Sequence, residues 1–118
     1  MQFMLLIHQG DSPTPRDPEA WARLSPEEQQ AVFADYGAVN ATPGVTPGRQ
    51  MAGPEDARTV RIQGKRPLVT DGPFVETKEA LGGYLFFEAE SMEEALELAA
   101  RIPAARHGGA VEVRPLVG

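Results

Sequence analysis

Hydrophobic residues recur along the chain in short blocks whose spacing predicts alternating strands and helices. The opening block QFMLLIH, residues 2–8, is apolar on both faces and ends near Gly10, which is typical of a buried central strand. The block GYLFFEA, residues 83–89, has the same character. Residues 110–117 predict a last strand and residues 49–52 a short one.

Two segments have helical periodicity behind an N-terminal cap. Ser25 and Ser91 are each followed three residues later by a glutamate, which is the pattern of a capping box. Pro26 suits the first helical position of one helix, and Pro103 ends the other. The positions expected to be buried are Val32, Phe33, Tyr36 and Val39 in the first helix and Met92, Ala95, Leu96, Ala99 and Ile102 in the second.

Two further β-rich runs, ARTVRIQ and RPLVT, lie between the helices and meet at Gly64-Lys65, so they predict a hairpin. The resulting order is βαββαβ with an inserted hairpin. This order predicts an α+β fold, a ferredoxin-like sandwich, as a single domain over residues 1–118.

Two helices cover only one face of such a sheet, yet the central strands are apolar on both. Met4 and Leu6 of the first strand share the second face with one side of the 83–89 strand. Because a large exposed apolar patch is unusual for a monomer, we expect a homodimer packed sheet to sheet. Coverage of this face by long loops of the same chain is the alternative.

Composition narrows the classes of partner. The chain of 118 residues has a formal net charge of −6 and no cysteine. The acidic balance argues against nucleic acid, which needs clustered Lys and Arg, and the missing cysteines exclude disulfides and thiolate chemistry. No apolar run approaches the roughly 20 residues of a membrane span, and no basic leader is present. We therefore expect a cytoplasmic protein with no membrane partner.

Candidate chemistry gathers where the first strand ends. In a ferredoxin-like sheet this end lies beside the starts of both neighbouring strands, so His8, Asp71 and His107 are expected at one pole. His8 is a candidate general acid–base because its ordinary pKa is near 6.5. Asp71, in the stretch TDGPF, either fixes a turn or serves as a preorganised base. The alternative for both histidines is a structural or exposed side chain.

The candidate ligand pocket comprises Phe74, Gly83 and Tyr84, which surround the same stretch. Phe74 is either a hydrophobic plug or a wall against a ligand, and Gly83 either permits a bulge or leaves room for one. The sequence has no phosphate-binding glycine loop, no G-x-S-x-G elbow and no H-E-x-x-H motif. We therefore expect no metal and no cofactor.

The run LVTDGPFVETKEALGGYLFFEAES, with MLLIH before it and AVEVRPL after it, resembles the DGPF-motif branch of the YCII-related family over nearly the whole chain. The resemblance implies a dimeric α/β barrel, and some relatives look like small cofactor-free enzymes acting on ring compounds. DGPF members are also associated with alternative sigma factors. The wider family has a His–Asp pair with the His near the start of helix one, where this sequence has Ser25-Pro26-Glu27-Glu28.

Two hypotheses follow. The first is a cofactor-independent isomerase, lyase or dehalogenase-like enzyme for a small cyclic substrate, in which Asp71 and His8 move protons while His107 or Tyr84 polarises an oxygen. The second is a non-catalytic dimer that senses a small molecule or docks onto a regulatory partner such as a sigma factor.

Overall fold

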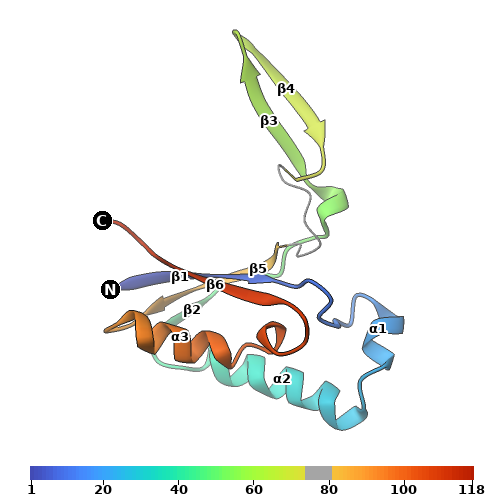
Figure 1. The fold of residues 1–118 in the computed structure, drawn as a ribbon, viewed down its shortest axis with the longest axis vertical. Helices are drawn as coiled ribbons and strands as arrows, with labels where there is room; N and C mark the ends of the chain where they lie inside the picture. Colours follow the sequence, from blue (N-terminus) through green and yellow to red (C-terminus); the bar gives the residue numbers. More distant parts are fainter. Residues whose placement is uncertain (74–80) are drawn as a thin grey trace.

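The computed structural model describes residues 1–73 and 81–118. Four strands form one antiparallel sheet in the order β2-β5-β1-β6, with β1 at its centre (Figure 1). The bounds of its strands are Gln2–His8 (β1), Val45–Pro47 (β2), Leu81–Glu88 (β5) and Ala110–Pro115 (β6). The helices are Pro18–Ala22 (α1), Pro26–Asn40 (α2) and Met92–Ala100 (α3), with short 3-10 turns at Pro54–Asp56 (η1) and Pro103–Ala105 (η2).

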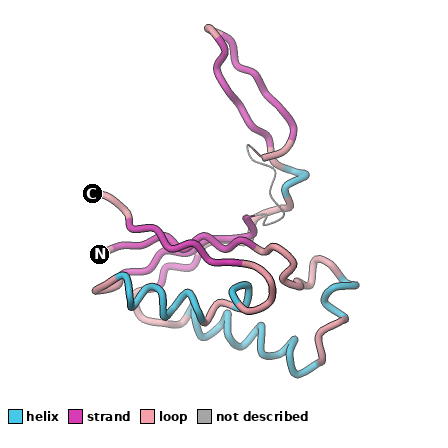
Figure 2. The backbone as a smooth tube through the Cα atoms, in the orientation of Figure 1, coloured by secondary structure: helices cyan, strands magenta, loops and turns pink. Residues whose placement is uncertain are grey.

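This arrangement is an α+β fold of the ferredoxin-like kind, as the order of the elements predicts. The register is set on both sides of β1, where Phe3 lies opposite Phe87 in β5 and Pro115 in β6. Helices α2 and α3 lie together on one side of the sheet (Figures 1 and 2). None of the helices of the described residues is long and apolar enough to cross a bilayer.

Strand alternation divides the sheet into a buried face and a half-buried face. Phe3 and Leu5 of β1 and Phe87 of β5 are almost fully buried beneath the helices. The intervening residues Leu6 and Phe86 point to the opposite face and keep part of their surface exposed. Because successive side chains of a strand point to opposite faces, the core lies between the sheet and the helices.

The helices begin where their caps predict. Ser25 and Glu28 form a reciprocal capping box before α2, and the Ser91 side chain accepts a hydrogen bond from the Glu94 backbone before α3. The expected buried stripe of α3 is wrong at one position. Leu96 is 51% exposed, whereas Leu98 is 1% exposed and occupies the core. Leu98 follows Ala95 by three residues, so it lies on the face that turns toward the sheet.

The short strand expected at residues 49–52 is also wrong, because β2 comprises Val45–Pro47 instead. Val45 pairs with Phe87, and Gly44 accepts a backbone hydrogen bond from Glu88 at 2.9 Å. After Pro47 the chain continues beside β5 with a backbone bond from Met51 to Gly82 of 2.9 Å, but a regular ladder is not maintained.

A separate two-stranded antiparallel sheet pairs Arg58–Gln63 (β3) with Arg66–Asp71 (β4), and it projects away from the main sheet (Figures 1 and 2). We call it the arm. Val60 lies opposite Val69, and the neighbouring Ile62 lies opposite Pro67, so these four share one face. Val60, Val69 and Ile62 are 61%, 61% and 67% exposed. The arm therefore carries an uncovered apolar face.

Candidate functional site

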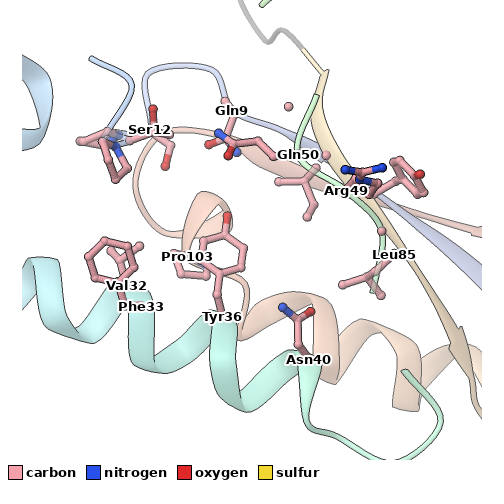
Figure 3. Close-up of a pocket in the computed structure, with 18 residues that line it drawn as sticks. Gln9, Ser12, Val32, Phe33, Tyr36, Asn40, Arg49, Gln50, Leu85 and Pro103 are labelled. Atoms are coloured by element: carbon pink, nitrogen blue, oxygen red, sulfur yellow. The ribbon is translucent and has the colours of Figure 1, made fainter. Parts of the chain in front are cut away.

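A cavity of about 350 Å³ opens between α2 and the end of the sheet where β1 finishes and β5 begins (Figure 3). The chain segment that follows β1 borders it as well. Four parts of the chain that are remote in sequence thus meet here: residues 7–15, residues 32–50, residues 82–85 and Pro103. Volumes of about 300–1,000 Å³ are typical of small-molecule sites, so this cavity suits a compact ligand.

The cavity exists because a side chain is missing from the buried face of β5. Phe87 and Leu85 fill that face, and by alternation Gly83 is the next residue on it. A Cβ atom placed on Gly83 would meet only Ile7 Cδ1 at 3.8 Å and the Arg49 carbonyl oxygen at 4.0 Å. The space that a larger residue would occupy therefore stays open.

The walls of the cavity are largely apolar. Ile7 and Leu85 come from the sheet, and Val32 and Phe33 come from α2 (Figure 3). Phe33 is 60% exposed, and its ring meets Trp21 of α1 edge to face with centroids 5.3 Å apart. Position 33 was expected in the core. It instead forms part of an aromatic pair at the side of the cavity.

Polar groups converge on the cavity from both sides. Tyr36 extends from α2 with its hydroxyl toward Gln9, which directly follows β1 (Figure 3). Burial raises the pKa of Tyr36, while a hydrogen bond from Gln9 and the charge of Arg106 act in the opposite direction. The phenol is therefore a neutral hydrogen-bonding group at physiological pH.

Gln9 has an unmet acceptor. Its Oε1 atom is buried and has no hydrogen-bond partner in the described part of the chain. The side chain is held in place by close packing on Gly82, since a Cβ there would lie 2.9 Å from Gln9 Nε2 and closer still to Gln9 Cγ. A buried unsatisfied acceptor is costly, so this oxygen is a natural partner for an N–H or O–H group of a ligand.

Two of the predicted pocket residues line this cavity, namely Gly83 and Tyr84. Tyr84 follows Gly83 on β5, and its ring meets Phe86 on the other face of the sheet at a centroid distance of 6.0 Å. Its carbonyl oxygen leaves no space for a side chain at Gly48, so residues 48–50 approach β5 closely. Phe74, the third predicted pocket residue, lies outside the described residues.

His8 lies at the sheet end but outside the set of residues that line the cavity. It pairs in register with Ala110 of β6 and Leu81 of β5, as the topology predicts. Its Nε2 is 3.3 Å from Glu112 Oε1, and Glu112 also pairs with Arg114. The hydrogen bond from Arg114, and then the one from His8, lower the pKa of the Glu112 carboxyl.

Asp71 and His107 also lie outside the lining of the cavity. Asp71 is the last residue of β4, at the base of the arm, where its carboxylate is 91% exposed and 3.1 Å from Arg58 Nε. His107 follows η2, in the turn that leads to β6, and its charge contributes weakly to lowering the pKa of Glu28. The roles proposed for His8, Asp71 and His107 stay predictions.

Residues 1–73 and 81–118 contain no group of three or more His, Asp or Glu side chains that could hold a metal ion. The sequence pattern did not predict Gln9 and Arg49 as cavity residues, and it placed Tyr36 only among the buried positions of the first helix. One feature of the sequence could have indicated Gln9, because it directly follows His8 at the polar end of the first strand. No feature of the sequence indicated Arg49, since the segment that carries it was expected to be a strand.

The amino-acid sequence matches a known family of proteins. Residues 1–117 match the YCII-related domain family. The chain is also similar to an uncharacterized protein of Rhizobium meliloti (strain 1021), with 32% identity over 121 residues that cover 98% of this chain and 92% of the relative. The chain therefore belongs to the YCII-related domain family.

Proposed function

We propose that this protein binds a small molecule in the cavity between α2 and the sheet. The observation that carries the proposal is the open space of about 350 Å³ that Gly83 leaves on the buried face of β5. Apolar walls with a few convergent polar groups are typical of ligand sites. The buried Gln9 oxygen supports the proposal because it lacks a donor among the described residues.

Binding, rather than turnover, is the function that the lining supports best. Among the described residues that line the cavity, none carries a carboxylate or an imidazole. General acid–base catalysis is most efficient when the catalytic pKa lies near the working pH, and Tyr36 titrates far above it. The proton-transfer enzyme predicted from the resemblance would require His8, Asp71 or His107 to reach the ligand. An Asp71→Asn variant with unchanged turnover would reject the role of Asp71 as the catalytic base.

We also propose that two copies pack sheet to sheet as a dimeric α/β barrel. Met4, Leu6 and Phe86 support this, because they form a half-buried apolar surface on the face that α2 and α3 do not cover. Sedimentation equilibrium tests the proposal. Leu6→Glu should shift the protein from dimer to monomer, and a wild-type chain that sediments as a monomer would reject the assembly.

The experiment on ligand binding uses the cavity-filling variant Gly83→Leu. A fragment library is screened by ligand-observed NMR, and each hit is located from the backbone amide shifts of residues 7–15 and 82–85. Hits should perturb these amides in the wild type and lose binding in Gly83→Leu. Gly37→Ala is the matched control, because Gly37 lies on the exposed side of α2 with open space around it. Hits that bind Gly83→Leu unchanged would place their site elsewhere and reject the proposal.

A further inference from the structure

The charge of the cavity differs from the charge of the chain. The protein has 17 acidic and 11 basic residues, yet Arg49 is the one Lys, Arg, Asp or Glu among the described residues that line the cavity. A single charge attracts a ligand of opposite charge, although water and salt weaken this attraction at an exposed position. A cationic ligand would meet Arg49 with no lining carboxylate to offset it. The lining therefore favours an anion or a neutral molecule.

Arg49 is available to a ligand. Its guanidinium makes no ion pair or hydrogen bond within the described ranges, in contrast to Arg58, Arg106 and Arg114, which each pair with a carboxylate. Arg49 is solvent-exposed and is one of the residues that line the cavity (Figure 3). A planar guanidinium binds a carboxylate through two parallel hydrogen bonds.

The second polar feature lies on another wall. Gln9 Oε1 accepts hydrogen bonds and lacks a donor, and the neighbouring Tyr36 hydroxyl is neutral. Ile7, Val32 and Leu85 supply apolar surface to the same space. A ligand that satisfies all of these groups has an acidic group for Arg49, a compact apolar body, and a hydroxyl or N–H group for Gln9.

We propose that the cavity selects small organic carboxylates, with Arg49 as the residue that binds the acid and Gln9 as the acceptor for a donor on the ligand. This inference rests on the proposed function, because it names the ligand class of the same cavity. It excludes small organic cations as ligands. It also predicts that affinity falls as salt concentration rises, since an exposed guanidinium is screened.

The test compares three probes of nearly equal shape: 3-hydroxybenzoate, 3-hydroxybenzamide and 3-hydroxybenzylamine. Dissociation constants are measured by NMR titration of the wild type, Arg49→Gln, Gly83→Leu and the control Arg66→Gln, whose arginine lies on the arm. We expect the carboxylate to bind at least about tenfold more tightly than the amide, and we expect the amine not to bind. Arg49→Gln should remove about tenfold of that advantage, which is the lower range for a hydrogen bond to a charged group. Arg66→Gln should bind as the wild type does.

The outcomes separate the ligand class from the existence of the site. The carboxylate proposal is overturned if the carboxylate and the amide bind equally, or if Arg49→Gln leaves carboxylate binding unchanged. In either case, loss of binding in Gly83→Leu still supports the site itself. Binding that survives Gly83→Leu overturns both. If none of the three probes binds while fragment hits still map to the cavity, the ligand class alone is wrong.

A separate comparison tests the role of Gln9. Replacing 3-hydroxybenzoate by benzoate should weaken binding in the wild type but not in Gln9→Ala, and an equal effect in both proteins would reject the role of Gln9.

Discussion

Gly109 provides a sharp test of how closely the chain packs at the end of the sheet where the cavity lies. Its amide donates to the Ala104 carbonyl at 2.9 Å, which joins the turn after η2 to the start of β6. A Cβ atom added at this position would lie 2.6 Å from the Gln9 carbonyl oxygen, 3.0 Å from the Ala104 oxygen and closer still to the His8 oxygen. All three neighbours are backbone atoms, so rotation of a side chain cannot relieve the contact.

Gly109→Ala should therefore destabilise the protein strongly. Overpacking typically costs about 1–3 kcal/mol, and three backbone contacts place this site near the upper end, at about 3 kcal/mol. For a chain of this length, such a loss lowers the melting temperature by on the order of 10 °C. The assay is thermal unfolding followed by circular dichroism at one fixed protein concentration.

Gly37→Ala is the matched control for this substitution. Gly37 lies inside α2, and a Cβ there has no neighbouring atom within 4 Å. Because alanine favours the helix, this variant should gain about 0.5–1 kcal/mol. The two glycine-to-alanine changes should thus move the melting temperature in opposite directions. A Gly109→Ala protein that melts with the wild type would refute the close approach of β1 and the turn before β6.

Three further predictions concern the core, a cap and the cavity. Leu98→Ala should lose about 2–5 kcal/mol in urea unfolding, whereas Leu96→Ala, at a half-exposed position, should change stability by less than about 0.5 kcal/mol. Ser25→Ala should lose about 1 kcal/mol at pH 7. Hydrogen bonds from Ser25 lower the pKa of Glu28 below its ordinary 4.5, so the contribution of this carboxylate is present above that value and is lost as pH falls through the lowered folded-state pKa. The stability gap between Ser25→Ala and the wild type should therefore narrow at low pH. Burial raises the pKa of Tyr36 above its ordinary 10.0, so spectrophotometric titration of Tyr36→Phe should lack the component that ionises at the higher pH.

Local signals were sufficient to predict most of the main sheet and its helices. The continuous apolar run of β1 and the serine caps before α2 and α3 each report on a few neighbouring residues, and each element forms where its signal lies. The errors occur where tertiary contacts decide. β2 is at Val45–Pro47 rather than 49–52 because pairing with Phe87 and the turn at Gly44 determine its position.

The site was predicted less well than the fold. Gly83 and Tyr84 could be placed at the sheet end from topology alone, and they line the cavity. Gln9 and Arg49 could not, and the place of Tyr36 beside them could not either, because their convergence depends on how α2 and the segment after β2 pack against the sheet. A hydrophobic period also cannot distinguish a core position from a cavity wall, as Phe33 shows.

The sheet topology has a consequence for the order in which the protein folds during synthesis. Phe3, near the start of the central strand β1, pairs with Pro115 of β6, so β1 cannot complete its pairing until residue 115 has been synthesised. The arm is different, because Val60 meets Val69 only a few residues later and a hairpin closes within about 1–10 μs. On the ribosome the arm is therefore expected to pair before the main sheet does, and until the main sheet forms both edges of β1 are unpaired. Unpaired strand edges favour aggregation, so this protein should depend on chaperones during synthesis more than its length suggests.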